Sequence, residues 1–538
     1  MIDEKKNTGI FHKIIEKTTG LLKNNYFLTS LLIFICTVFW FSVSYCFLYQ
    51  NNGFFNGDKA MFGLILKDLR AGRFYSWYFY GQIYYGNLSY FASLPLTFIF
   101  GVSRKALVFY DFLFYGLSVF FGLASFKFIS NFKLLVPLFT FILFFYGRHL
   151  EFSYSIQGFS IVLFIITLMF FWFKKIIRKE YKIDWKILFF TPMISALGIW
   201  HNPLYSFVGP VLLLILTYLR FKPRIKHFLQ FIAGFMIGII PFVMGTVEKN
   251  YVNWSFFGAN KTLSYYESGN YFLRDWFFFP FSNTYLVPGR LGEYFKNLIN
   301  TQTPSVFAIF TDALPWISIS FISIFVILIG VLMVKRETSL LINYVFISLI
   351  AFLIISKNSD QSMVVFANIR YALPFFFLVI LTTLELFTIA FKNPNPNFIN
   401  PAVKYLTLIL VVFFVMNSMV RLNYQYKVPD KGMHFNELAY LDIEKLGIKN
   451  LFCWNYYEMC APLAYLGYEY GLNVYVLENA GRNPRGEKNA IKARENGEDL
   501  YTIMPENMVP KDKGIVILGQ YRMLPTTPNY VLYKGFFG

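Results

Sequence analysis

Residues 56–105 read NGDKAMFGLILKDLRAGRFYSWYFYGQIYYGNLSYFASLPLTFIFGVSRK. They follow the first long apolar segment of the chain, residues 27–49. A segment of that length can cross a bilayer, because about 20 apolar residues in a helix span the hydrocarbon core. Asp58 is therefore the first carboxylate that the chain presents beyond the membrane.

The first part of this stretch predicts a short helix from Asp58 to Ala71. The Asp58 carboxylate can accept the unpaired amide hydrogens of a first helical turn, and Gly72 suits the left-handed conformation that ends a helix. One face of this helix is polar and the other is apolar, so we expect it to lie in the membrane surface. The polar face has Lys59, Gly63, Lys67 and Arg70, and the apolar face has Met61, Leu64, Ile65 and Leu69.

Residues 88–101 predict a second short helix. They are apolar, but as a helix they would be only about 21 Å long, whereas the hydrocarbon core is roughly 30 Å thick. We therefore expect a second interfacial helix and not a crossing.

The composition indicates a polytopic membrane protein. Hydrophobic residues make up 56% of the chain, and charged residues only 15%. Together with residues 27–49, the apolar runs of membrane length predict about eleven transmembrane helices in a module over residues 27–422. The later ones are 105–129, 132–148, 155–173, 187–203, 205–220, 228–247, 306–334, 338–356, 368–391 and 403–422.

The basic residues fix the expected orientation. The net charge of +19 would suggest a nucleic-acid partner in a soluble protein, but here the positive charges gather in short loops, which are typical cytoplasmic anchors. These loops are 174–186, 220–226, 335–336 and 392–404. With the basic tail 1–26 in the cytoplasm, all four face inside, and the loops 50–104 and 248–305 face outside. We expect membrane lipids, and no nucleic acid, as partners.

Residues 423–538 predict a small soluble α/β domain on the outer side. No membrane-length apolar run follows residue 423, and the charge becomes balanced. Short strands are expected at 450–455, 473–477, 514–519 and 530–533, with a helix near 457–470. Cys453 and Cys460 share this region, and their spacing is compatible with a disulfide or with two free thiols.

The first outer loop resembles that of GT-C glycosyltransferases, membrane enzymes that take a sugar from a polyprenyl-phosphate carrier. The group includes protein O-mannosyltransferases and aminoarabinose transferases. The resemblance implies that Asp58 is the catalytic acidic residue, although Lys59 stands where several members have a second acid. It rests on Gly57-Asp58-x-Ala60, Gly63-Leu64, Gly72-Arg73, Phe79-Tyr80-Gly81-Gln82, Tyr84, Gly86, Leu88 and Phe100-Gly101.

Sugar transfer from a lipid phosphate needs a base for the acceptor hydroxyl and positive charge for the departing phosphate. Asp58 is the candidate base, and the alternative is that it only caps a helix. Arg370 begins a segment similar to the Arg-Tyr-x-x-Pro pattern of a late helix in these enzymes. A guanidinium there can grip phosphate oxygens, or it can simply reach the lipid headgroups. His201, Arg274 and Arg290 are weaker candidates for the same role.

Other outer residues are candidates for sugar, acceptor or metal contacts. Glu151 matches a further acid that GT-C enzymes often have in the second outer loop, and His149 lies beside it. Tyr80, Gln82 and Tyr84 are candidates for contact with the sugar. Some relatives need a divalent metal, Mg or Mn, and others do not; the sequence has no spacing that decides. Three acids lie within predicted spans, where such residues usually face a cavity or a partner. Asp111 and Asp312 lie near the outer ends and are expected to line the active cavity, whereas Glu385 lies deeper and is expected to form a structural pair.

The sequence thus predicts an inverting, extracytoplasmic glycosyltransferase in a bacterial plasma membrane, with a polyprenyl-phosphate-sugar donor. The acceptor, whether a cell-surface glycan, a lipid or a protein, stays open. A transporter or flippase for a lipid-linked sugar is the alternative, but it predicts an internal repeat with interrupted helices, which the sequence does not show. A third reading, an enzyme-like fold kept as a binding subunit, is favoured by Lys59.

Overall fold

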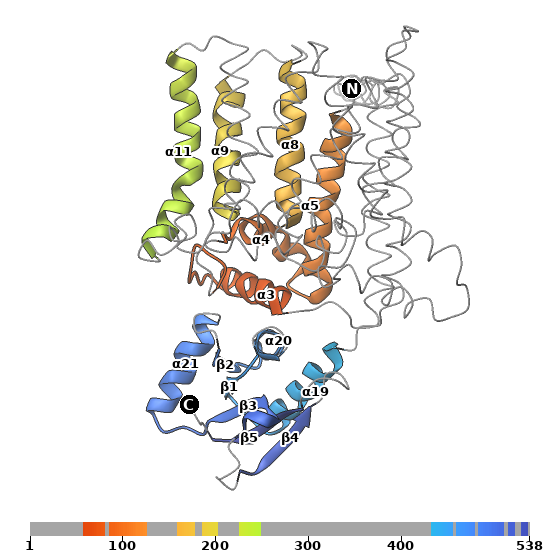
Figure 1. Cartoon of the computed structure of the whole chain (residues 1–538), viewed down its shortest axis with the longest axis vertical. Helices are drawn as coiled ribbons and strands as arrows, with labels where there is room; N and C mark the ends of the chain where they lie inside the picture. The colour runs from red at the N-terminus through yellow and green to blue at the C-terminus, as the bar shows by residue number, and fades with distance from the viewer. Residues whose placement is uncertain are drawn as a thin grey trace, which may run out of the picture.

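The computed structural model describes residues 57–80, 85–125, 159–177, 185–202, 225–248, 432–455, 459–478, 483–509, 515–521 and 529–535. Within them lie a set of upright helices and, beyond one end of these, an α/β domain (Figure 1). The predicted boundaries at residues 26 and 422, and most of the loop 248–305, lie outside the described residues.

Four helices stand side by side in the membrane module (Figure 1). They are α5 (Arg104–Ala124), α8 (Phe159–Ile177), α9 (Trp185–His201) and α11 (Ile225–Glu248). Each lies on one of the predicted spans. Among the described residues, the segments Arg104–Gly122 and Ile225–Glu248 are long and apolar enough to cross a membrane. The predicted total of about eleven spans depends on further segments outside this part of the chain.

α11 has the surface of a lipid-facing helix. It packs along α9, and Gly234 and Gly238 lie on that side. Large apolar side chains cover much of its remaining surface, and the rest of the chain leaves them exposed. Such a surface suits hydrocarbon better than water. These side chains are Phe228, Leu229, Met236, Ile240, Val243 and Val247.

The first outer loop forms the two short helices that the sequence predicts. α3 (Gly57–Arg70) and α4 (Leu88–Phe100) lie at one end of the upright helices, next to the α/β domain (Figure 1). α4 has 13 residues, so it is too short to cross a bilayer. Gly72 follows α3 with φ +72°, the left-handed conformation expected there.

The predicted polar face of α3 is exposed only in part: Arg70 is exposed and Lys67 is partly exposed, but most of the helix is covered. Ten of its fourteen residues are buried, and Lys59 and Gly63 are among them. The reason is that α3 is covered from two sides, by α5 of the membrane module and by the C-terminal domain. α3 is therefore an internal helix at the junction of the two parts.

The C-terminal domain is α/β, as predicted. Its five-stranded sheet has the order β2-β1-β3-β5-β4, in which β1 runs parallel to β2 and β3, and β5 runs antiparallel to β3 and β4. The sequence did not predict α19, α21 or β3. The elements are α19 (Gly432–Lys445), β1 (Asn450–Cys453), α20 (Ala461–Leu466), β2 (Asn473–Val476), α21 (Pro484–Glu495), β3 (Tyr501–Pro505), η7 (Glu506–Met508), β4 (Ile517–Tyr521) and β5 (Tyr530–Lys534).

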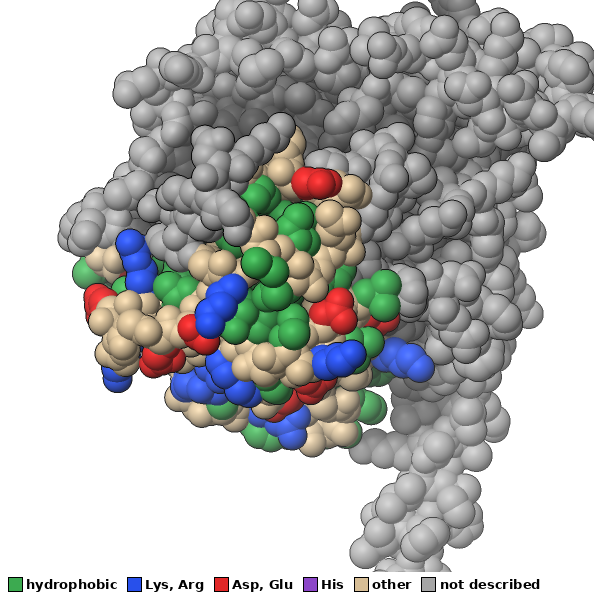
Figure 2. All heavy atoms as spheres, turned by 90° about the horizontal axis from the view of Figure 1, so that it is seen from below, with side chains coloured by type: hydrophobic (Ala, Val, Ile, Leu, Met, Phe, Trp, Pro, Cys, Tyr) green, Lys and Arg blue, Asp and Glu red, His purple; other side chains and the backbone are tan. Residues whose placement is uncertain are grey.

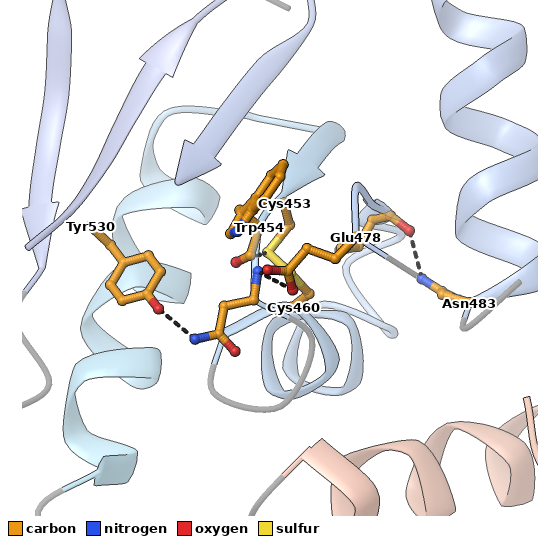
Figure 3. The surroundings of a disulfide bond; sticks show 8 residues. Cys453, Trp454, Cys460, Glu478, Asn483 and Tyr530 are labelled. Carbon is orange, nitrogen blue, oxygen red and sulfur yellow. Dashed lines mark hydrogen bonds between the residues drawn. A yellow bond between two sulfur atoms is a disulfide. The ribbon is translucent and has the colours of Figure 1, made fainter. Parts of the chain in front are cut away.

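A disulfide joins Cys453 at the end of β1 to Cys460 just before α20 (Figure 3). Of the two possibilities left open by the sequence, the structure has the bridged one. The two Cα atoms are 5.5 Å apart, within the usual range for a disulfide. Because only a few residues separate the two cysteines, the bridge fixes the start of α20 relative to the sheet.

The outer face of the C-terminal domain carries both signs of charge. Figure 2 shows basic, acidic and apolar side chains intermixed over this face. A nucleic-acid interface of an independent domain would gather Lys and Arg on one face. The described part of this face has no such one-sign patch. The absence of a nucleic-acid partner stays a prediction.

Candidate functional site

Asp58 lies in the first turn of α3. The helix begins at Gly57, one residue before it, so Asp58 is inside the turn and not at the capping position that the sequence predicts. Its side chain is half-buried. A carboxylate in a first turn is stabilised by the unpaired amide hydrogens and the helix dipole. The place therefore favours a charged acid that solvent or a ligand can still reach.

Lys59, the next residue, is fully buried and forms an ion pair with Asp111 of α5. The Lys59 Nζ donates to Asp111 Oδ2, and the Ser160 hydroxyl of α8 donates to Asp111 Oδ1 at 3.1 Å. The sequence predicts that Asp111 lines the active cavity; in the structure it is buried and pairs with Lys59 instead. The pair and the serine tie the first turn of α3 to two upright helices.

His201 ends α9 and is completely buried against the first outer loop. Its Nδ1 lies 2.8 Å from the carbonyl oxygen of Gly86, and its Nε2 lies 3.4 Å from the Tyr85 hydroxyl. Because a carbonyl only accepts, Nδ1 is the donor in the first contact. In the neutral ring, Nε2 then accepts from Tyr85. His201 thus holds the loop on α9 in this structure, and its phosphate-binding role stays a prediction.

The loop is also tied to α11 by Glu248. The Ser76 hydroxyl donates to Glu248 Oε1 at 2.6 Å, and the Trp77 amide donates to Oε2 at 2.9 Å. Asn87 closes the loop by donating to the carbonyl oxygens of Ser76 and Tyr78, each at 2.8 Å. Sequence reasoning missed Glu248; its one signal was an acid at the outer end of a predicted span.

Tyr80, a candidate for sugar contact, is buried, and its hydroxyl donates to Asp68 Oδ2 at 3.1 Å. Burial, followed by the nearby Asp68 carboxylate, raises the pKa of Tyr80. Burial likewise raises the pKa of Asp68, against the opposing hydrogen bonds from Tyr468 and Tyr80 and the charge of Arg73. Tyr80 therefore contacts a neighbouring helix here, while Gln82 and Tyr84 lie outside the described residues.

The other candidates lie in parts of the chain that the structure does not describe. These are His149, Glu151, Arg274, Arg290, Arg370, Asp312 and Glu385. Within the described ranges, no group of three His, Cys, Asp or Glu side chains is placed to hold a metal ion. Among the described residues, Asp58, Tyr80 and His201 all lie on or against the first outer loop, and Asp111 contacts it through Lys59.

Gly86 gives a test of how this loop is held. A Cβ at this position would lie 2.4 Å from the carbonyl oxygen of Trp200, a backbone atom that cannot move aside. We expect Gly86→Ala to lower the free energy of unfolding by about 2–3 kcal/mol, as for an overpacked interior. Thermal unfolding in mild detergent, with hydrogen exchange of residues 185–202, measures the change.

The matched control is Gly72→Ala. Gly72 has a left-handed backbone conformation, φ +72°, and a Cβ there would meet nothing within 4 Å. The Gly72→Ala substitution should lower the free energy of unfolding by only about 1 kcal/mol, the cost of alanine in a left-handed conformation. It should leave hydrogen exchange in α9 unaltered. Equal effects of the two substitutions on α9 would contradict the close contact between Gly86 and Trp200.

Comparisons with known proteins bear on the fold. No family profile matches the sequence, and no curated protein matches it. Among solved structures, the chain is similar to ArnT from Cupriavidus metallidurans bound to undecaprenyl phosphate, with 10% identity and a TM-score of 0.52 over 95% of this chain and 97% of that one. The apo state of the same protein also matches, with 10% identity and a TM-score of 0.46 over 96% and 98%. The chain therefore shares the fold of ArnT, a GT-C fold, as the resemblance of its first outer loop predicted.

Proposed function

We propose that this protein is an integral-membrane glycosyltransferase that transfers a sugar from a polyprenyl-phosphate carrier to an extracytoplasmic acceptor. The observation that carries the proposal is the place of Asp58. It lies half-buried in the first turn of α3, at the end of the upright helices, in a chain with the fold of ArnT. The ArnT structure that matches contains undecaprenyl phosphate, which supports a donor of that chemical class.

In the proposed reaction, an acceptor hydroxyl attacks the anomeric carbon of the donor sugar. Asp58 takes the hydroxyl proton as the new bond to oxygen forms. The bond between that carbon and the phosphate oxygen breaks, and polyprenyl phosphate leaves with the electron pair. Direct displacement of this kind inverts the configuration at carbon. Arg370, with His201 and Arg290 as further candidates, would hold the departing phosphate, and Glu151 with His149 would contact the acceptor.

The proposed location is a bacterial inner membrane, with the N-terminus in the cytoplasm and the C-terminal domain outside. The disulfide between Cys453 and Cys460 supports an outer position for that domain, because disulfides persist in oxidising compartments such as the periplasm. Asp58 would share that side, since α3 contacts the C-terminal domain.

Lipid binding tests the donor class. We expect native mass spectrometry of the protein, purified in mild detergent, to show a bound lipid with the mass of a polyprenyl phosphate, with or without a sugar. Added undecaprenyl phosphate should bind in preference to phosphatidylglycerol at the same concentration. If only bulk phospholipid is retained after undecaprenyl phosphate is added, the proposed donor is wrong.

A further inference from the structure

The C-terminal domain packs directly on the helix that carries Asp58. Tyr465 of α20 lies against α3 at Gly63, where a Cβ would be only 2.3 Å from the tyrosine ring. The hydroxyl of Tyr465 donates to the carbonyl oxygen of Val102 at 2.7 Å, in the connection between α4 and α5. Glycine at position 63 is therefore what permits this contact.

A buried polar contact lies further along α3. Tyr468, just after α20, donates from its hydroxyl to Asp68 Oδ1 at 2.9 Å and accepts from Arg73 Nη2 at 2.6 Å. The side chain of Asp68 is only 2% exposed. Its other oxygen accepts from Tyr80, as described above. Tyr468 of the C-terminal domain thus shares with Tyr80 and Arg73 the task of satisfying a buried carboxylate of α3, which is costly to leave without donors.

Cationic side chains surround the same tyrosines. Lys67 donates to the carbonyl oxygen of Tyr465 at 3.2 Å, and its Nζ lies 4.5 Å from the ring centre of Tyr465 and 5.0 Å from that of Tyr468. Arg485, at the start of α21, lies 4.4 Å from the ring centre of Tyr468. Contacts of this kind between cations and aromatic faces add to the polar bonds. The Lys67 contacts hold α3 to α20 and the residues just after it, whereas the Arg485 contact fixes Tyr468 within the domain.

The domain side of this contact is itself fixed. The disulfide attaches the residue before α20 to the end of β1, and the amide of Cys460 donates to the carbonyl oxygen of Asn455 at 3.1 Å. One hydrophobic cluster continues from the apolar residues of α3 through α20 to the strands of the sheet. A second tie, between Arg104 of α5 and Glu437 of α19 at 2.6 Å, joins the domain to the upright helices.

We propose that the C-terminal domain is a positioning element for the catalytic helix, with Tyr468 as its main polar contact; this rests on the proposed role of Asp58. Lys59 fixes the first turn of α3 to the upright helices, and Tyr468 fixes its other end to the domain. Asp68 lies ten residues after Asp58, about 15 Å along a rigid helix. A constraint at Asp68 therefore sets the tilt of α3 and, with it, the place of the Asp58 carboxylate.

Motion at position 58 is the direct test. A nitroxide label is placed on Asp58→Cys in the full chain, with Cys36 and Cys46 replaced by serine and the disulfide kept. Tyr468→Phe is then added, which removes the hydroxyl but keeps the ring under Lys67 and Arg485. We expect sharper, more mobile spectral lines from the label and about tenfold or faster hydrogen exchange of residues 57–70, because a bond to a charged group is lost.

The matched control is Tyr475→Phe. Tyr475 lies on β2 of the same domain and contacts the ring of Phe452, away from α3. It should leave the label and the exchange of α3 unchanged. Lys67→Met, which removes the cation but no tyrosine, should change both in the same direction as Tyr468→Phe. Exchange in β1 and β3 reports that the domain itself stays folded in each variant.

The outcomes separate this inference from the proposed function. If label mobility and α3 exchange are the same in Tyr468→Phe and in Tyr475→Phe, the positioning role is wrong, whatever the protein binds. If both change as expected while undecaprenyl phosphate fails to bind the unmodified protein, the coupling of the domain to α3 holds and the proposed donor fails. Loosening of α3 with intact lipid binding supports both.

Discussion

Asp58→Asn is expected to lower the rate of sugar transfer by about 10²–10⁴-fold, the usual contribution of a general base. Asparagine keeps the size of the side chain but cannot take the acceptor proton. Because Asp58 is only half-buried and lies in a first turn, the loss of its charge should leave the fold intact. Binding of undecaprenyl phosphate should also be retained, since the residues proposed to hold its phosphate are cations and not Asp58.

The measurement follows the lipid that co-purifies with the protein. Mass spectrometry records the conversion of the sugar-linked carrier to the bare polyprenyl phosphate in the presence of a membrane extract that supplies acceptors. Asp499→Asn is the matched control, because Asp499 pairs with Lys534 on the surface of the C-terminal domain and its substitution should change the rate less than about twofold. Undiminished transfer by Asp58→Asn would remove Asp58 from the mechanism. Lipid binding with no transfer by the unmodified protein would favour the transporter alternative.

The sequence predicted the local structure of the first outer loop because the signals there are local. The length of residues 88–101, the acid at Asp58 and the glycine at position 72 each report on a few neighbouring residues. The helices α3 and α4 follow from them. The start of α21 also has a local sequence signal, an asparagine followed by a proline, which is typical of a helix start. In the structure, Asn483 accepts a hydrogen bond from the Gly486 amide, and Pro484 is the first residue of the helix.

The contacts of α3 could not be predicted from the sequence, because the residues that it contacts lie far away in the chain. Amphipathic spacing shows that a helix has two faces, but it does not show what covers each face. The lysine at position 59 reads as a surface cation until Asp111, 52 residues on, is found beside it. Asp68 contacts Tyr468 across 400 residues, and no spacing rule links them. For Asp111 alone there was a usable signal, the cost of an acid within a membrane span.

Lys59→Met is expected to lower the free energy of unfolding by about 3–5 kcal/mol, because it leaves the buried Asp111 carboxylate without its cation. The Ser160 hydroxyl remains as a donor to the other oxygen, but one neutral bond replaces little of the lost charge interaction. Thermal unfolding in mild detergent, followed by tryptophan fluorescence, measures the effect.

The double variant Lys59→Met with Asp111→Leu tests whether the stability lost in Lys59→Met comes from an uncompensated buried charge. If the cost of the single change is an uncompensated buried charge, removal of both charges should restore most of the stability, since an apolar pair of similar volume can replace a buried ion pair. If the double variant is as unstable as the sum of the two single ones, packing and not charge holds this end of α3. Restored stability would also explain how a lysine fits beside the proposed catalytic acid, because the Lys59 charge is engaged with Asp111 of α5.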